Sequence, residues 1–298
     1  MHKIVVLLLV LLVSCAKMTD ERRAKLAREN YTEGMSAYSA KEYGDAVRKL
    51  SEALKYLEHL SPEEIKTAKY TLAESYYLKK DYVNAVVYFE DFMFYYPDSP
   101  ESEKVYFMLV DSYMKVAPDA YRDQSYTMKA IDKAKDFLSR YPSGPYTEKV
   151  KALVEEAYKK LARHEYLIAR FYEDFGYHYS AALRYRDLMI NYHGYISEAE
   201  VLYRYIKSLF LVEEQAKRQQ FKYEKWMDEV NEKLKDVKSE KDRTILNNRL
   251  EFLKKEIERW KTLAEDSKKE GLKHMQTYRE VYGENVYYKE LKKYAKQP

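Results

Sequence analysis

The sequence predicts an all-α protein, built as a solenoid of about five helix pairs with an antiparallel helical hairpin inserted near the C-terminus. The first observation is composition: the chain has only seven glycines and seven prolines in 298 residues, and it is rich in Lys, Glu, Leu and Ala, which favour helices. The second is a pattern of small and apolar residues with a period of about 34 residues, which is typical of tetratricopeptide helix pairs. The third is a long stretch without helix breakers after the repeats.

The charge pattern argues against a polyanionic partner. The 53 basic and 49 acidic residues are mixed along the chain and give a net charge of +4. No segment therefore offers the concentrated positive field that holds nucleic acid, and no nucleic-acid partner is expected. Because 46% of the residues are hydrophobic, the chain can bury a sizeable core and is expected to fold.

Residues 1–14 are typical of a lipoprotein signal peptide. A short basic start and the apolar run Ile4–Val13 lead to the small Ser14 and then to Cys15. The run is shorter than the roughly 20 residues that a membrane-spanning helix needs, so we expect the segment to be removed. The tetrapeptide Leu12–Cys15 resembles the bacterial lipobox, in which the cysteine thiol is joined to diacylglycerol and the signal is cut before the cysteine.

Cys15 is the predicted lipidation site and the first residue of the mature protein. It is the only cysteine, so it has no disulfide partner, and a free thiol in an oxidising compartment would be a liability unless it is capped. The alternative is an ordinary secretory signal with an incidental cysteine. Apart from this covalent lipid, the sequence predicts no cofactor and no metal.

The lipid predicts where the protein resides. Two or more acyl chains give durable membrane binding, and residues 15–27 are expected to form a lipidated tether. Ala16 follows the cysteine in place of the aspartate that favours retention at the inner membrane. We therefore expect the protein on the periplasmic face of the outer membrane, bound to the membrane through its lipid.

The clearest repeat spans residues 66–99. Its first predicted helix carries Leu72, Ala73 and Tyr76, and its second carries Tyr82, Ala85, Phe89 and Phe92 before Tyr96 and Pro97. Ala73 and Ala85 lie where the two helices must approach closely, and the aromatic residues fill the space around them. This arrangement predicts one complete helix pair.

The same pattern recurs before and after this repeat. Its main markers are Gly34, Tyr38, Tyr43, Ala46 and Leu50 in the first repeat; Leu109, Tyr113, Ala130, Ala134 and Phe137 in the third; and Ala162, Ala169, Tyr172, Gly176, Ala182 and Tyr185 in the fourth. An insertion around Pro118 lengthens the turn inside the third repeat. Since one helix pair cannot bury its apolar face alone, stacked neighbours must create the core. The predicted solenoid covers residues 28–216, with repeats 1–4 and the first helix of repeat 5.

The C-terminal third predicts a fold-back. No glycine or proline interrupts residues 195–270, and one straight helix of that length would extend for about 110 Å. Two apolar stripes flank the polar stretch 238–242, and their spacings of three and four residues are typical of a coiled-coil seam. The stripes are Trp226, Val230, Leu234 and Val237, and then Leu246, Leu250, Leu253, Ile257, Trp260 and Ala264. Residues 217–264 are thus predicted as a hairpin inserted into repeat 5, and residues 265–298 as the second helix of that repeat and a tail.

With its lipobox and repeats, the chain resembles the BamD family of lipoproteins, which serve the outer-membrane β-barrel assembly machinery. The stretches that carry the resemblance are Tyr141–Tyr146 (Tyr-Pro-Ser-Gly-Pro-Tyr), His164–Gly176 with Glu165, Ala169 and Tyr172, and the helix with Ala182, Arg184 and Tyr192. The resemblance implies a five-repeat scaffold that binds the barrel insertase and unfolded outer-membrane proteins. Here His193 replaces a family proline, and the hairpin at 217–264 departs from shorter family members.

Two sets of candidate binding residues follow. Positions seven residues apart on a tetratricopeptide first helix face the groove, and here they are Tyr31, Tyr38, Tyr70 and Tyr77. Tyrosines suit an extended peptide that ends in an aromatic residue, which is the signal that the resemblance implies for substrates; the alternative is that these side chains simply pack in the solenoid. The resemblance also implies that Arg184 pairs with an acidic residue of the insertase, a role that suits its planar charge; the alternative is a solvated side chain.

The sequence contains no catalytic motif. It has no His-Glu-x-x-His, no Gly-x-Ser-x-Gly and no phosphate-binding glycine loop, and the cysteine is assigned to the lipid. The expected function is a non-enzymatic scaffold of the barrel assembly machinery. An adaptor for peptidoglycan or other envelope complexes is the alternative, and an enzyme such as a helical lytic transglycosylase would need a separate catalytic domain for which the chain has no room.

Overall fold

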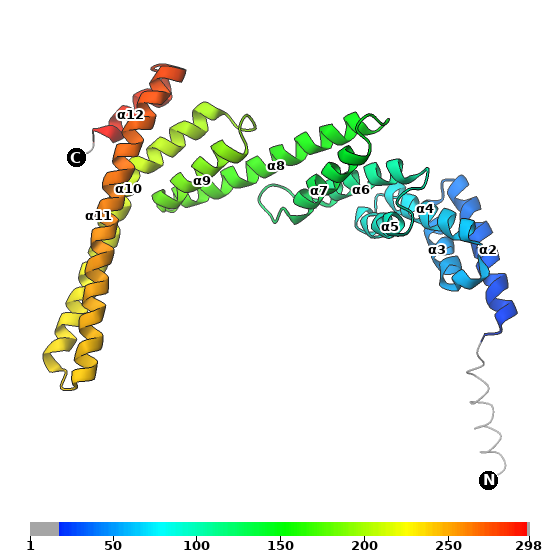
Figure 1. Cartoon of the computed structure of the whole chain (residues 1–298), viewed down its shortest axis with the longest axis horizontal. Helices are drawn as coiled ribbons and strands as arrows, with labels where there is room; N and C mark the ends of the chain where they lie inside the picture. The colour runs from blue at the N-terminus through cyan, green and yellow to red at the C-terminus, as the bar shows by residue number, and fades with distance from the viewer. Residues whose placement is uncertain (1–17, 297–298) are drawn as a thin grey trace, which may run out of the picture. The chain divides into compact units, whose positions relative to one another are not determined.

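The computed structural model describes residues 18–296, and all of their regular secondary structure is helical (Figure 1). This confirms the predicted all-α class. The contacts divide the chain into two units. In the described residues, unit 1 comprises 18–118 and 124–157, and unit 2 comprises 119–123 and 158–296.

Unit 1 consists of consecutive helix pairs. Its helices are α2 (Asp20–Ser39), α3 (Tyr43–Ala53), the 3-10 helix η2 (Leu54–His59), α4 (Pro62–Leu78), α5 (Tyr82–Tyr95), α6 (Ser102–Val116), α7 (Ser125–Arg140) and the first part of α8 (Thr147–Asp174). The pairs α2/α3, α4/α5 and α6/α7 correspond to the first three predicted repeats. Ala73 and Ala85 are fully buried, as expected for small residues where two helices approach closely.

Three of the turns inside the pairs, those after α2, α4 and α8, share one backbone conformation. Lys41 (φ 62°) follows α2, Lys80 (φ 65°) follows α4, and Gly176 (φ 74°) follows α8. In the first two turns, the N–H of this left-handed lysine donates to the carbonyl of Tyr38 or Tyr77, three residues earlier. Such a left-handed residue satisfies the last carbonyls of a helix and reverses the chain, so these three first helices lead directly into their partners.

The N-terminal tether is shorter than the sequence predicted. Helix α2 begins at Asp20 with Thr19 as its N-cap, so residues 20–27, which were assigned to the tether, are helical. Ala27 is fully buried because it packs against Ala53 and Leu60. The boundary at residue 28 was therefore wrong, although Thr19 followed by two acidic residues is a recognisable helix start.

Unit 2 contains the longest helices. It comprises the rest of α8, α9 (His178–Asn191), α10 (Glu198–Asp236), α11 (Glu240–Tyr282) and α12 (Val286–Ala295). Its core includes the buried residues Tyr185, Ile206, Tyr278 and Leu291. Helix α12 lies in the segment that the sequence assigned to a tail. Its Asn285 cap accepts a hydrogen bond from the Tyr288 N–H, and Leu291 anchors it in the core.

The hairpin is the distal part of two continuous helices. Helix α10 runs through residue 217 and α11 runs through residue 264 without a break, and the chain reverses at residues 237–239. Val230, Leu253 and Ala264, all from the two predicted stripes, are buried. The hairpin thus extends the helix pair of repeat 5, and no separate insert is present between its helices.

The α6–α7 connection does more than lengthen a turn. Its residues 119–123 belong to unit 2, and the carbonyl oxygen of Ala120 lies 2.8 Å from His164 Nδ1 on α8. The insertion predicted around Pro118 therefore packs on α8.

Candidate functional site

The four tyrosines that the sequence assigned to the groove lie half-buried on two first helices of unit 1, Tyr31 and Tyr38 on α2 and Tyr70 and Tyr77 on α4. The Tyr31 ring packs against two apolar clusters centred on Leu50 and on Ala53. The other three hydroxyl groups make polar contacts with later helices. The tyrosines therefore contribute to the contacts between repeats.

A ladder of tyrosine–carboxylate hydrogen bonds joins successive first helices. The Tyr38 hydroxyl donates to Glu74 Oε2 at 2.8 Å, and the Tyr77 hydroxyl donates to Asp111 Oδ2 at 2.8 Å. In unit 2, Tyr166 on α8 donates in the same way to Glu200 on α10 at 2.5 Å. Donor and acceptor are 36, 34 and 34 residues apart, so the bond repeats with the helix pairs. Charge-assisted bonds of this kind are the stronger ones in proteins.

Lys104 completes the polar cluster around Glu74. Its Nζ donates to Glu74 Oε1 at 2.6 Å and to the Tyr70 hydroxyl at 2.9 Å. Burial alone would lower the pKa of Lys104, but its hydrogen bonds to Glu74 and Tyr70 outweigh burial and raise the pKa. Burial also raises the pKa of Tyr70 to about 12. The cluster therefore keeps a lysine cation, 41% exposed, beside a buried glutamate.

These contacts change what a peptide would meet in the groove. Because the hydroxyls of Tyr38 and Tyr77 already donate to carboxylates, they have no free proton to offer a ligand. The half-buried tyrosine rings and the exposed part of Lys104 are the features that a ligand could contact. Binding of a substrate by these tyrosines stays a prediction, and the packing role that the sequence left open is present in the structure.

Arg184 lies on α9, and its side chain is 42% exposed. Its Nη1 atom donates to Glu165 Oε2 on α8 at 3.2 Å. The guanidinium is therefore held by an ion pair across the fourth helix pair while part of it faces solvent. Its pairing with a partner protein stays a prediction.

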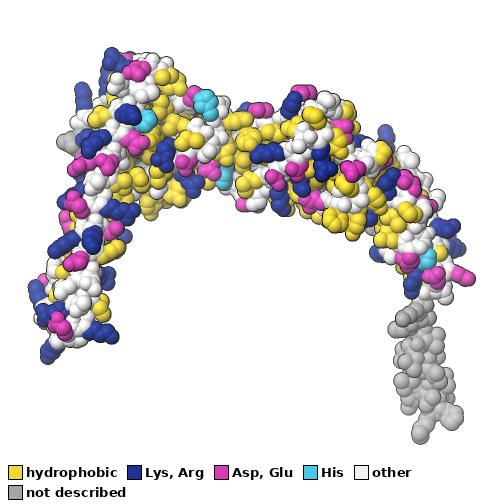
Figure 2. All heavy atoms as spheres, in the orientation of Figure 1, with side chains coloured by type: hydrophobic (Ala, Val, Ile, Leu, Met, Phe, Trp, Pro, Cys, Tyr) yellow, Lys and Arg dark blue, Asp and Glu magenta, His cyan; other side chains and the backbone are white. Residues whose placement is uncertain are grey.

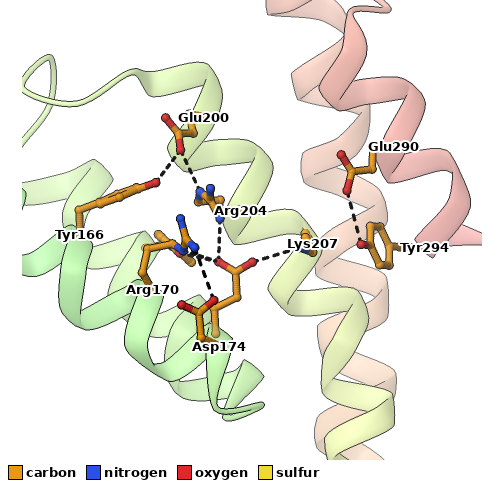
Figure 3. A network of polar contacts seen from close by, with 10 residues as sticks. Tyr166, Arg170, Asp174, Glu200, Arg204, Lys207, Glu290 and Tyr294 are labelled. Atoms are coloured by element: carbon orange, nitrogen blue, oxygen red, sulfur yellow. Dashed lines mark hydrogen bonds and ion pairs between the residues drawn. The ribbon is translucent and has the colours of Figure 1, made fainter.

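A buried carboxylate, Glu173, joins three helices of unit 2. It is 8% exposed, and it accepts hydrogen bonds from Tyr185 on α9 at 2.6 Å and from Arg204 and Lys207 on α10 at 3.1 Å each. Figure 3 shows Arg204 and Lys207 reaching from α10 toward α8, with Arg204 also bonded to Glu200. Arg170 Nε on α8 also lies 3.9 Å from Glu173 Oε2. Three cations thus compensate one buried charge, and Tyr185 is a further hydrogen-bond donor.

The electrostatics of this network favour the charged carboxylate. Burial alone would raise the pKa of Glu173, but the Tyr185 hydrogen bond and the charges of Lys207 and Arg204 outweigh it and hold the pKa below its usual range. This network was not predicted from the sequence. Glu173 precedes Arg204 by 31 residues and Lys207 by 34 residues. These spacings are close to the repeat period of about 34 residues, and this similarity is the signal in the sequence that could have indicated the contact.

Exposed aromatic side chains gather at the end of α8. Phe171 is 54% exposed, Phe175 is 66% exposed and Tyr177 is 49% exposed, and the rings of Phe171 and Phe175 lie 4.5 Å apart. Figure 2 shows hydrophobic side chains over the α8–α9 turn. A groove of about 270 Å³ between α8 and the loop with Tyr121 adjoins Phe171. Exposed apolar patches of this kind mark protein interfaces.

Cys15 lies outside the described residues, so its lipidation stays a prediction. Over residues 18–296, no helix is both long and apolar enough to cross a bilayer. Nor does this part of the chain bring three or more His, Cys, Asp or Glu side chains together as a metal site.

Comparison with known proteins decides the family. The model of the YfiO family, described as an outer membrane lipoprotein, matches residues 23–223, which is most of the chain. The chain belongs to this outer-membrane lipoprotein family. The matched segment contains most of α2, all of the helices from α3 to α9, and the first part of α10. It therefore includes the tyrosine ladder, Arg184 and the Glu173 network.

The similarity to one curated protein extends beyond the family match and over the hairpin. The chain is 51% identical over 288 residues to the putative outer membrane protein assembly factor BamD of Aquifex aeolicus, and the match covers 97% of this chain and 94% of that protein. The hairpin is too long to fall within the uncovered 3%. It is therefore part of the region that the two proteins share.

Two solved structures are similar at a lower level. One is a TPR repeats protein from Bacteroides fragilis, 15% identical, and the other is the TPR2AB domain of yeast Sti1 in complex with pHSP90, 14% identical. Each match covers 91% of this chain and 97% of the other, with a TM-score of 0.34. These scores are too low to support an argument about the fold.

Proposed function

We propose that this outer-membrane lipoprotein is a non-enzymatic scaffold that serves the assembly of β-barrel proteins on the periplasmic face of the outer membrane. The observation that carries the proposal is the similarity to the putative assembly factor BamD over 97% of the chain. Helix pairs linked by side-chain ladders provide an extended surface for binding other proteins, which suits a scaffold.

The barrel insertase is the proposed partner of unit 2. The aromatic patch of Phe171, Phe175 and Tyr177 supplies apolar area, and Arg184 on the neighbouring helix supplies a fixed charge. Aromatic residues and arginines are enriched at the centres of protein interfaces. An acidic residue of the partner could share the Arg184 guanidinium with Glu165 or displace Glu165 from it.

Unfolded outer-membrane proteins are the proposed ligands of the groove in unit 1. An extended segment there would stack on the half-buried tyrosines and could place a carboxylate near Lys104. Two or more acyl chains on Cys15 would hold the scaffold at the membrane, since each buried methylene contributes about 0.8 kcal/mol.

The test of the insertase interface exchanges one arginine at a time. Arg184→Glu should reduce the amount of insertase that co-purifies with the lipoprotein at least fivefold. The substitution replaces the proposed interface cation with a negative charge, which would repel the acidic residue of the insertase. Arg186→Glu is the matched control, since Arg186 lies on the same helix with a similar exposed fraction of 49%. Equal recovery with both variants would refute the role of Arg184.

Depletion of the protein separates the proposal from the alternative of an envelope adaptor. If the protein is a scaffold of barrel assembly, its depletion should lower the amount of folded β-barrel proteins in the outer membrane while peptidoglycan synthesis initially continues. Normal barrel levels, together with co-purification of a peptidoglycan hydrolase or synthase, would favour the adaptor and contradict the proposal.

A further inference from the structure

The hairpin formed by residues 217–264 carries the net charge of the protein. It contains 14 basic and 10 acidic residues, whereas the whole chain contains 53 and 49. The hairpin therefore has the same net charge as the entire chain, +4, and the charges outside it are balanced. Because its distal arms bury few side chains, most of these charges face solvent.

The outer side of α11 carries a stripe of exposed residues without an acidic member. Positions that follow one another after four and three residues lie along one face of a helix. From residue 241 to residue 259, such a stripe extends for about 27 Å, and all six of its side chains are exposed. These residues, called here the basic stripe, are Lys241, Ile245, Asn248, Phe252, Lys255 and Arg259.

The charges of the basic stripe are compensated only in part. The side chains of Lys241 and Lys255 form no hydrogen bond or ion pair within residues 18–296, whereas Arg259 pairs with Glu256 at 3.2 Å. The residues that border the stripe on the helix surface are Arg249 and Glu256 on one side, and Thr244 and Glu251 on the other. With its borders included, this face of α11 presents four cations and two carboxylates, so it remains positive.

Two apolar side chains project from the basic stripe. Ile245 is 55% exposed and Phe252 is 58% exposed, and they lie two helical turns apart between Lys241 and Lys255. The contact with α10 uses another face of α11, which carries the buried Leu253, so the hairpin does not need these two side chains for its own packing. In Figure 2, hydrophobic side chains are visible on the hairpin among basic ones. Basic residues around exposed apolar ones are typical of helices that lie on a membrane surface.

The pattern favours a lipid surface over two kinds of protein partner. A helix that docks on another helix uses apolar anchors at every turn, but the position between Ile245 and Phe252 is Asn248 and the next position is Lys255. A second copy of this chain related by twofold symmetry would place the same cations opposite one another. A layer of anionic headgroups requires neither a continuous apolar ridge nor a complementary shape.

We propose that the basic stripe of α11 binds the anionic phospholipid surface of the membrane to which the lipoprotein belongs. Lys241, Lys255 and Arg259 contact the phosphate groups, and Ile245 and Phe252 insert between the headgroups. Each Lys or Arg close to an anionic leaflet strengthens such binding. The proposal does not depend on a role in barrel assembly, because it rests on the stripe and on membership of a membrane lipoprotein family.

The test places a fluorescent reporter within the stripe of the full-length lipoprotein. Cys15 is the only cysteine, so its lipidation leaves an introduced cysteine as the sole reactive thiol, and the wild type should take up no label. Asn248→Cys is labelled with an environment-sensitive fluorophore, and the protein is inserted through its own lipid into vesicles. Emission should rise at least twofold in phosphatidylcholine vesicles that also contain phosphatidylglycerol, relative to phosphatidylcholine alone. Added salt should reverse the rise, since it screens the headgroup charges.

Matched controls separate the stripe from the rest of α11. Asn247→Cys places the reporter one residue away, about 100° around the helix, at a position that is also exposed; its emission should not depend on phosphatidylglycerol. With the reporter at residue 248, Lys241→Glu/Lys255→Glu should abolish the rise and Phe252→Ser should reduce it at least twofold. Lys254→Glu/Lys261→Glu makes the same change in charge at exposed positions on the opposite side of α11 and should retain it.

The proposal is overturned if the reporter at residue 248 does not respond to phosphatidylglycerol, or if the reporter at residue 247 responds equally. The same conclusion follows if the two double lysine variants lose the response to the same extent. A reporter at residue 248 that stays in water on anionic vesicles but is shielded in native outer membranes would show that a protein covers the stripe, which also contradicts the proposal. Circular dichroism of each variant checks that the helices are retained.

Discussion

At the scale of single residues, Gly34 shows how closely α2 and α3 approach. A Cβ atom at this position would lie 2.7 Å from Leu50 Cγ, and Leu50 is fully buried. Overpacking of this kind costs about 1 to 3 kcal/mol. We expect Gly34→Ala to lower the free energy of unfolding by that amount, measured by urea denaturation.

Gly44 provides the control for this substitution. It lies on α3, in the same helix pair, and a Cβ atom there would meet nothing within 4 Å. Gly44→Ala should leave the free energy of unfolding unchanged or raise it slightly, since alanine favours a helix over glycine. An equal loss in both variants would show that close packing is not the reason for Gly34.

Glu173 is the residue on which the contacts among α8, α9 and α10 converge. Glu173→Ala would leave Arg204 and Lys207, whose side chains are 17% and 21% exposed, without their shared partner. Breaking a buried ion pair in this way costs about 3 to 5 kcal/mol. Thermal unfolding should therefore begin at a clearly lower temperature. Asp174→Ala is the control. Because the Asp174 side chain is 59% exposed, this substitution should change the unfolding temperature little.

The same network predicts a pH dependence with a definite sign. The folded state lowers the pKa of Glu173, while an unfolded glutamate has a pKa of about 4.3. The stability that ionised Glu173 contributes to the folded state is therefore fully present above about pH 4.3, and it is lost as the pH falls through the lower pKa of the folded state. The difference in Tm between the wild type and Glu173→Gln should shrink on acidification from pH 6 toward pH 3. A difference that stays constant over this range would contradict the ionised role of Glu173.

Residue-level contacts were the least predictable part. The sequence placed Tyr38 and Tyr77 on the correct helices, but their bonds to Glu74 and Asp111 became evident only when consecutive first helices were brought together. A repeat period predicts which positions face a neighbour, whereas the rotamers and the choice among nearby carboxylates depend on packing. The Glu173 network was missed for the same reason.

At the scale of helices, periodicity predicted most of the architecture. The repeats at 66–99 and around it correspond to observed pairs, and the polar stretch 238–242 lies at the reversal between α10 and α11. The errors in the predicted helix boundaries fall at the two ends of the helical region, where few residues define a pattern. The start of α2 was placed too late, and α12 was taken for a tail because ten residues carry a short apolar stripe.

The hairpin offers a prediction at the same scale. Within residues 221–255, only Val230 and Leu253 are buried, and the hairpin's cluster of Val212, Ala216 and Ala264 lies outside this segment. Replacing 221–255 by a short glycine–serine loop should therefore leave a cooperatively unfolding protein whose Tm changes by only a few degrees, measured by circular dichroism. Loss of cooperative unfolding would show that the distal arms support the core of unit 2.

At the scale of the whole molecule, the lipid predicted on Cys15 is expected to hold the protein at the membrane. If Cys15 carries the lipid, Cys15→Ala should abolish lipid attachment, and the signal peptide of this variant must then be removed by another route or retained. We expect the variant to leave the membrane fraction for the soluble periplasm, measured by fractionation and immunoblotting with mass determination of the chain. A mature-sized variant that stays with the membranes would show that protein partners suffice for attachment.

The central claim is that this outer-membrane lipoprotein is a scaffold of barrel assembly. The most direct measurement is purification of the tagged full-length lipoprotein from detergent-solubilised outer membranes, followed by mass spectrometry of the proteins that accompany it. The account predicts recovery of the barrel insertase. Repeated absence of the insertase while the lipoprotein itself is recovered intact would contradict the account.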